Sequence, residues 1–159
     1  MNPPVYVETT IVSYLTARPT SDVERQAQQV TTRRWWDERR AHFELYTSQF
    51  VLDEAAAGDA VAAAERAAVL GDIELLLIAP EVEPLAAQLL AAGALPPKAR
   101  VDALHVAVAT VNGMEYLLTW NCRHLANATL WRKIEQTCVE AGYEPPTICT
   151  PYELMGVES

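Results

Sequence analysis

The chain has 159 residues, of which 50% are hydrophobic and 21% charged, and it carries a net charge of −9 at pH 7. This length and composition predict a single domain over residues 1–159 with a substantial core. No apolar run approaches the ~20 residues that span a bilayer, and the N-terminus lacks the pattern of a signal peptide. Three widely spaced cysteines indicate neither a disulfide framework nor a zinc site. We therefore expect a cytoplasmic protein with no membrane segment. Its acidity argues against non-specific nucleic-acid binding over the whole surface, but not against a local basic patch.

Strand and helix patterns alternate along the chain. In the first half the predicted elements are a strand at Pro4–Val7, a helix through Ile11 and Leu15, a long helix from Val23 to about Phe43, a strand at Leu45–Phe50, a helical segment at Val51–Ala57 and an alanine-rich helix to Leu70. In the second half they are a strand at Glu74–Ala79, a helix at Glu83–Ala92, a helix from Val101 to near Gly113, a strand at Tyr116–Trp120, a helix at Ala128–Ala141 and a strand at Thr147–Thr150. This alternation predicts an α/β fold with a mostly parallel sheet and helices on both faces.

The long helix from Val23 concentrates positive charge in an acidic protein. Its five arginines are interleaved with Trp35 and Trp36. Such a helix can present a basic surface to nucleic acid, or a solvated face with an aromatic anchor on the core side. We favour the second interpretation, and the two are compatible.

The helix around Asp102 is apolar on nearly all sides, which is typical of a buried helix. A carboxylate there is costly unless an ion pair, hydrogen bonds or a metal ion compensates it. The next strand runs to Trp120 and is followed by Asn121, at the position where open α/β sheets place their sites.

Other carboxylates are predicted to reach the same edge of the sheet. Glu8 follows the first strand, where it is either a surface turn residue or a ligand. Of the neighbours Asp53 and Glu54, we expect Glu54 to point inward because it lies three residues after Val51. Together with Asp102 and Asn121 these oxygen donors suit Mg²⁺ or Mn²⁺ rather than zinc. The chain lacks a glycine-rich phosphate loop and a Gly-x-Ser-x-Gly motif. The sequence therefore does not contain the usual motifs of nucleotide-binding proteins or serine hydrolases.

Four segments resemble the motifs of the PIN-domain family, and most of all its VapC-type toxin branch. They are Val5–Leu15 (VYVETTIVSYL), Ser48–Glu54 (SQFVLDE), Asp102–Ala107 (DALHVA) and Leu118–Asn127 (LTWNCRHLAN). The resemblance spans nearly the whole chain, and the last two segments are the specific ones. It implies a PIN-like three-layer α/β/α sandwich and a metal-dependent ribonuclease with an acidic cluster at the carboxyl edge of the sheet.

The resemblance implies that Glu8, Glu54, Asp102 and Asn121 are the catalytic, metal-binding residues. Glu8 departs from the usual Asp, and Asn121 is neutral where an acid is common, so metal affinity is expected to be lower. The resemblance further implies an RNA substrate, a cognate antitoxin and a homodimer. For these protein contacts we expect the apolar faces around Tyr14, Leu15, Trp35 and Trp36.

Roles around the four residues are assigned more loosely. Thr9 and Thr119 are expected to support the metal ligands through hydrogen bonds. For His105 a core or supporting role is expected, while Arg123 and His124 are either RNA contacts or surface residues.

Two alternatives remain open. One is a PIN-fold binding module without turnover, which the neutral Asn121 favours slightly. The other is a phosphatase-like Mg²⁺ enzyme, which would need a nucleophilic Asp after the first strand, where this chain has Glu8.

Overall fold

A five-stranded parallel sheet forms the centre of the protein. The structure is a computed structural model, and it describes residues 2–156 of the chain. The strand order is β3-β2-β1-β4-β5, and every pairing is parallel. The strands are β1 (Pro4–Val7), β2 (Glu44–Thr47), β3 (Glu74–Leu75), β4 (Tyr116–Leu118) and β5 (Thr147–Cys149). The predicted α/β class with a parallel sheet is therefore confirmed.

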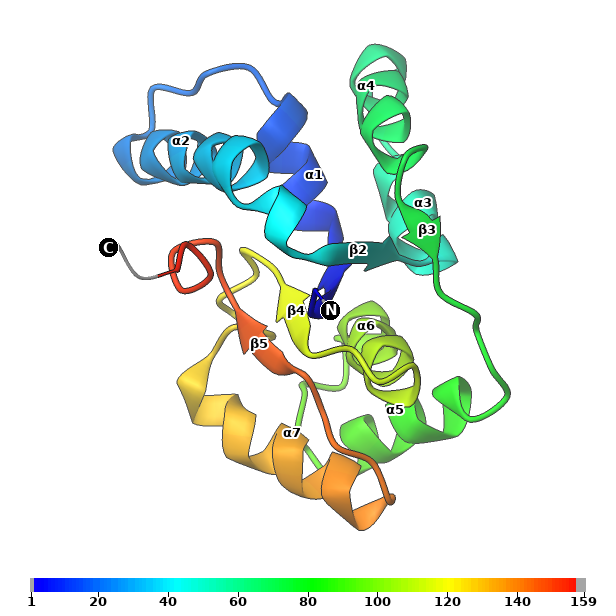
Figure 1. The fold of residues 1–159 in the computed structure, drawn as a ribbon. Coiled ribbons are helices and arrows are strands. Elements are labelled where there is room, and N and C mark those ends of the chain that lie inside the picture. Colours follow the sequence, from blue (N-terminus) through cyan, green and yellow to red (C-terminus); the bar gives the residue numbers. More distant parts are fainter. Residues whose placement is uncertain (1, 157–159) are drawn as a thin grey trace.

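Helices cover both faces of this sheet. They are α1 (Thr9–Thr16), α2 (Val23–Glu38), the 3-10 helix η1 (Arg40–His42), α3 (Gln49–Ala55), α4 (Ala60–Leu70), α5 (Val82–Ala91), α6 (Arg100–Val111) and α7 (Ala128–Glu140). Figure 1 shows α1, α2 and α4 on one side of the sheet and α5, α6 and α7 on the other. None of the helices within residues 2–156 is long and apolar enough to cross a membrane.

The central strand and the α6 helix are the most deeply buried elements. Val5, Tyr6 and Val7 of β1 are fully buried, as expected for a parallel strand with helices on both faces. In α6, residues 103–110 are all buried, so the predicted buried helix is confirmed. Asp102, one residue before this run, lies at the edge of the core and stays partly exposed.

Several predicted boundaries are wrong at the ends of elements. The strand predicted at Glu74–Ala79 pairs only over Glu74–Leu75, because β3 is an edge strand with a neighbour on one side. Leu77, in the unpaired continuation, is 75% exposed. The second strand stops at Thr47 because Gln49 already begins α3. The long helix stops at Glu38 rather than near Phe43, since the chain turns through η1 to enter β2.

Trp35 anchors α2 to the core and holds the C-terminal turn. Its ring is fully buried and stacks on Phe43, and its Nε1–H donates to the carbonyl of Leu154 at 3.1 Å. The prediction that Trp35 contributes to a surface for protein contacts is therefore wrong, because its side chain is buried within the chain. Tyr14, from the same predicted surface, stacks on Trp120 within the chain.

The arginines of α2 and η1 make contacts within the chain. Arg33 donates to the carbonyl of Ala17 at 3.1 Å, and Arg34 pairs with Glu38 at 3.1 Å. The Arg40 guanidinium lies 4.4 Å from the centroid of the Trp36 ring. These contacts agree with a solvated basic face that has an aromatic anchor below it, and the alternative of contact with nucleic acid stays a prediction.

We expect Trp35→Phe to lower the free energy of unfolding by about 1–3 kcal/mol, because it leaves the buried Leu154 carbonyl without its donor. Trp35→Ala should cost about 3–5 kcal/mol through the cavity it leaves. Urea denaturation followed by circular dichroism measures both. The matched control is Trp36→Phe at the partly exposed neighbour, where a change of about 0.5 kcal/mol is expected. Equal effects at the two positions would contradict the anchoring role of Trp35.

Candidate active site

The candidate site lies where the direction of strand addition reverses. From β1 the chain adds β2 and β3 on one side of the sheet, then β4 and β5 on the other. Glu8 directly follows β1, and Thr119 to Asn121 directly follow β4, its neighbour in the sheet. Open α/β sheets bind ligands at the carboxyl ends of strands at this kind of switch point.

Glu8 is a buried carboxylate held by neutral donors. The residue is only 3% exposed, and its Oε1 accepts hydrogen bonds from the Thr10 hydroxyl at 2.5 Å, the Thr10 amide at 3.2 Å and the Thr119 hydroxyl at 2.6 Å. Glu8 therefore also caps α1, through its hydrogen bond from the Thr10 amide. Burial raises the pKa of Glu8 because it disfavours the charged form, although the charge of His105 and the two threonines oppose this shift.

Glu54 points toward the same place from α3. Its Oε1 accepts a hydrogen bond from the Thr9 hydroxyl at 2.6 Å and lies 2.6 Å from His105 Nε2. Asp53 instead bonds Gln49 on the surface, so Glu54 is the residue that faces the site, as predicted. Burial alone would raise the pKa of Glu54, but the hydrogen bond and charge of His105, together with Thr9, lower it below its ordinary value.

Glu8, Glu54 and His105 form one cluster of possible ligands. One ligand atom from each lies within 4.8 Å of the others. Two carboxylates this close repel each other, and a divalent cation would relieve that repulsion. The donor set therefore fits Mg²⁺ or Mn²⁺ through the two carboxylates. We name this group the Glu8–Glu54 cluster.

Asp102 and Asn121 meet in a second group, and neither belongs to the three-residue cluster. Asn121 Nδ2 donates to Asp102 Oδ1 at 3.3 Å, and His124 Nδ1 lies 2.9 Å from Asp102 Oδ2. Asn121 Oδ1 accepts the backbone N–H of His124 at 3.0 Å, which closes the group. The compensation that a carboxylate on α6 requires comes here from hydrogen bonds. We name this set the Asp102 group.

Threonines join the two groups. Thr119 Oγ1 donates to Glu8 and accepts the backbone N–H of Asn121 at 2.9 Å. Thr10 Oγ1 similarly accepts the backbone N–H of Trp120 at 2.7 Å. The start of α1 and the end of β4 are therefore tied together around Glu8. The expected supporting contacts of Thr9 and Thr119 are present, on Glu54 and Glu8 respectively.

Sequence reasoning missed Tyr6 and Ser48 entirely, and it gave His124 only a surface or RNA-contact role. Tyr6 Oη lies 2.7 Å from both His105 Nδ1 and Ser48 Oγ. Burial, together with the charges of Glu8 and Glu54, raises the pKa of Tyr6, so its hydroxyl keeps its proton. A tyrosine within an apolar strand gives no sequence signal for such a role.

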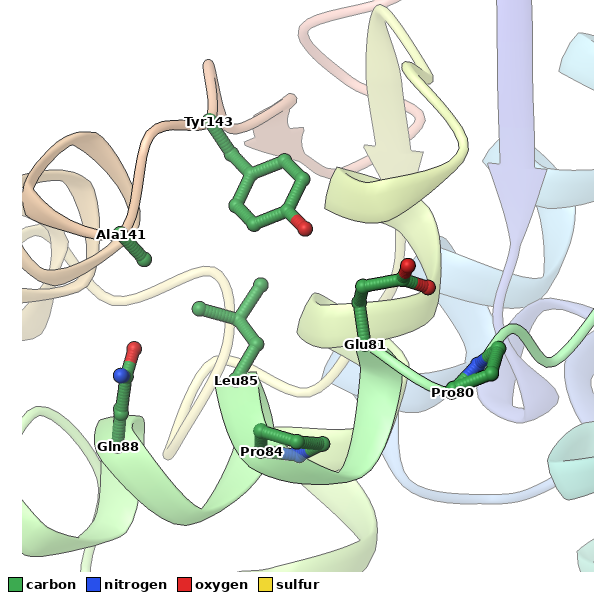
Figure 2. A pocket seen from close by; sticks show the side chains of 7 residues that line it. All are labelled: Pro80, Glu81, Pro84, Leu85, Gln88, Ala141 and Tyr143. Carbon is green, nitrogen blue, oxygen red and sulfur yellow. The ribbon is translucent and has the colours of Figure 1, made fainter.

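A pocket of about 310 Å³ lies elsewhere, between α5 and the segment after α7. Figure 2 shows the Tyr143 ring across from Leu85, with Glu81 beside them. Its lining includes no member of the Glu8–Glu54 cluster or the Asp102 group. This hollow therefore has no part in the site.

If the Glu8–Glu54 cluster binds a cation, Mn²⁺ or Mg²⁺ should raise the melting temperature by mass action on the native state. At concentrations about 100-fold above the dissociation constant, a rise on the order of 5–10 °C is expected for a domain of this size. Scanning calorimetry with and without Mn²⁺ measures the shift. An unchanged melting curve at millimolar Mn²⁺ would rule out the cluster as a metal site.

Glu8→Gln is the control, because it keeps the acceptor oxygen and removes the charge. It should abolish the Mn²⁺ shift. A carboxyl with a raised folded pKa stabilises the protein below its unfolded value of about 4.5, and this contribution is lost as pH rises through the folded pKa. In EDTA the variant should therefore match the wild type near pH 4 and be the more stable of the two at pH 7–8.

The sequence matches no protein-family model and no curated protein. The structure is similar to the crystal structure of VapC20 from Mycobacterium tuberculosis, which is described as a toxin that cleaves the sarcin–ricin loop. The TM-score is 0.59 at 19% sequence identity, over 76% of this chain and 92% of that one. At this identity the likeness establishes the fold. The chain therefore has a PIN-like α/β fold similar to that of VapC20, and the fold that the resemblance of its motifs implied is confirmed.

Proposed function

We propose that this protein is a Mg²⁺- or Mn²⁺-dependent endoribonuclease that hydrolyses RNA phosphodiester bonds, and that it is the toxin of a toxin–antitoxin pair. The observation that carries the proposal is Glu8, a buried carboxylate with neutral hydrogen-bond donors, at the switch point of the sheet and beside Glu54. The likeness of the fold to a toxin described as cleaving the sarcin–ricin loop supports RNA as the substrate class.

The two carboxylates of the Glu8–Glu54 cluster would hold the cation, with Asp102 and Asn121 contributing from the neighbouring group. When bound, the cation supplies Lewis-acid stabilisation of the charge that develops on the scissile phosphate. Thr10 and Thr119 fix the Glu8 carboxylate, and Thr9 and His105 fix that of Glu54. Held in this way, the acids need little rearrangement during the reaction.

Asn121 affects the net charge of the Asp102 group. Its amide donates to Asp102, so it offsets part of the carboxylate charge where an acid would add to it. Asn121→Asp would replace this donor with a like charge, which repels Asp102 in the absence of a cation and attracts the cation when one is bound. The attraction should prevail once a divalent ion is present.

The wild type should cleave a mixed RNA pool in the presence of Mn²⁺. Asp102→Asn should reduce the rate on the order of 100-fold or more while keeping the fold, because the amide is nearly isosteric with the carboxylate but neutral. Asn121→Asp should raise the rate at limiting Mn²⁺. Cleavage rate measured against Mn²⁺ concentration, with gel analysis of the products, tests all three proteins.

Asp53→Asn provides the matched control, since Asp53 is an exposed carboxylate on α3 that bonds Gln49 away from the site. Its rate should equal that of the wild type. Unimpaired cleavage by Asp102→Asn would refute the role of Asp102. If only Asn121→Asp fails to help, Asn121 is a positioning group and the three-acid site stands.

A second candidate function is a PIN-fold binding module without turnover. The observation that favours it is that both Asp102 oxygens are already engaged, by Asn121 and His124. A carboxylate satisfied in this way has less need of a cation. Absence of RNA cleavage in a protein whose melting temperature still responds to Mn²⁺ would favour this module over the nuclease.

We further propose that a protein antitoxin binds near the candidate active site, and that the protein forms a homodimer. With Trp35 buried, the dimer is supported instead by the exposed apolar edge of the sheet. Leu75 of the edge strand β3 is 47% exposed, and Leu77 and Ile78 in the segment that follows it are 75% and 39% exposed. An edge strand can pair with a second chain, and exposed apolar residues beside it favour such a contact. If the adjacent upstream gene encodes a small DNA-binding protein, this would support the proposed antitoxin partner.

Sedimentation equilibrium should show a dimer at high micromolar concentration. Leu77→Lys should shift the protein toward the monomer, because a charge at the edge opposes strand pairing. Val23→Lys, at an equally exposed apolar position on α2, is the control and should leave the dimer intact. A monomeric wild type, or a dimer that ignores Leu77→Lys, would contradict pairing through this edge.

A further inference from the structure

Four side chains from separate parts of the chain form one hydrogen-bonded series that ends at Glu54. Ser48 Oγ lies 2.7 Å from Tyr6 Oη, Tyr6 Oη lies 2.7 Å from His105 Nδ1, and His105 Nε2 lies 2.6 Å from Glu54 Oε1. Ser48, Tyr6 and His105 are fully buried, whereas the Glu54 side chain is 37% exposed. We name this series the His105 relay.

The hydrogen atoms in the relay can be assigned from the groups themselves. An ionised carboxylate only accepts, so the hydrogen between His105 and Glu54 is carried by Nε2. In the neutral ring Nδ1 then accepts from the Tyr6 hydroxyl, and Tyr6 in turn accepts from Ser48. In the charged ring the Nδ1 and Tyr6 directions reverse, but the hydrogen on Nε2 stays. Both forms therefore present an N–H to Glu54.

The hydrogen on Nε2 determines how His105 acts in the Glu8–Glu54 cluster. An imidazole binds a metal through the lone pair of an unprotonated nitrogen. Nε2 carries a hydrogen, and Nδ1 is taken up by Tyr6. Although His105 lies within 4.8 Å of both carboxylates, its ring has no lone pair directed at a cation held between them.

The Ser48 side chain takes part in the relay in place of its usual role at a helix start. It is the N-cap residue of α3, where a serine hydroxyl normally accepts a backbone N–H of the helix. Here its side chain makes no capping hydrogen bond and bonds Tyr6 instead. The helix forgoes a stabilising contact, and the buried tyrosine hydroxyl gains a second partner.

We propose that His105 is a positioning residue that fixes the Glu54 carboxylate through Nε2–H, with Tyr6 and Ser48 fixing the ring, so that only oxygen atoms meet the cation. This inference rests on the proposed function. It assigns the site to cations that prefer oxygen ligands, such as Mg²⁺ and Mn²⁺, over Zn²⁺, for which imidazole is a favoured ligand. Hydrogen-bond partners of ligating carboxylates commonly change metal affinity 10- to 100-fold when removed.

The first test is spectroscopic and does not depend on catalysis. Long-range ¹H–¹⁵N NMR of the metal-free protein should show His105 protonated on Nε2, with assignment by comparison with His105→Gln. Addition of Mg²⁺ should leave this nitrogen protonated. An unprotonated Nε2 in the metal-free protein would overturn the proposal. Loss of the Nε2 proton when Mg²⁺ is added would show that His105 is a metal ligand, and would overturn it as well.

The second test compares two substitutions of similar size by Mn²⁺ titration calorimetry. His105→Gln keeps an N–H donor and should bind Mn²⁺ within about 3-fold of the wild type, whereas His105→Leu should bind about 10-fold or more weakly. Tyr6→Phe should give an intermediate loss, because the ring keeps its Nε2–H but loses its support. Circular dichroism melting confirms that each variant is folded.

The outcomes separate this inference from the proposed function. If the wild type binds Mn²⁺ and His105→Leu binds it equally well, the positioning role is wrong and the nuclease proposal stands. Equal loss in His105→Gln and His105→Leu would likewise refute the role of the N–H donor. If the wild type binds neither Mn²⁺ nor Mg²⁺, the proposed function fails, and the positioning role fails with it.

Discussion

The burial of the Glu8 carboxylate is the constraint on which the site depends. Removing an ionised carboxylate from water costs several kcal/mol unless the protein replaces its hydration. The chain supplies three hydrogen bonds to Oε1, from the Thr10 amide and hydroxyl and from the Thr119 hydroxyl. These donors come from the start of α1 and the end of β4. The hydrogen bonds that the buried Glu8 carboxylate requires therefore hold these two segments together. Because all three donors are neutral, they solvate the charge without cancelling it.

The Asp102 carboxylate is compensated in a different way from that of Glu8. It sits at the N-terminal end of α6 and stays partly exposed, with an amide and an imidazole against its two oxygens. Water can therefore also hydrate the charge of Asp102, whereas the buried Glu8 carboxylate depends on the protein alone. This difference explains why the Glu8–Glu54 cluster, rather than the Asp102 group, is the part of the site with the greater electrostatic demand for a cation.

The α6 helix links the two groups because it carries both Asp102 and His105, three residues apart. Asp102 reaches Asn121 and His124 after β4, while His105 reaches Glu54 on α3 and Tyr6 on β1. The buried helix α6 thus sets the spacing between polar residues that come from separate elements of the chain. This arrangement gives the preorganisation that the proposed hydrolysis of phosphodiester bonds would require.

The sequence by itself determined the alternation of elements, the burial of α6 and the positions of Glu8 and Asn121 after strands, because these depend on local periodicity and chain order. It also indicated that Glu54 rather than Asp53 faces the site. Only the tertiary structure decided that β3 is a short edge strand, that Trp35 is buried, and that the polar residues divide into two groups. Contacts such as Tyr6–His105, between residues 99 positions apart, depend on which strands are neighbours and where side chains point across the sheet. Sequence periodicity carries no information about either, because it records only which face of its own element a residue occupies.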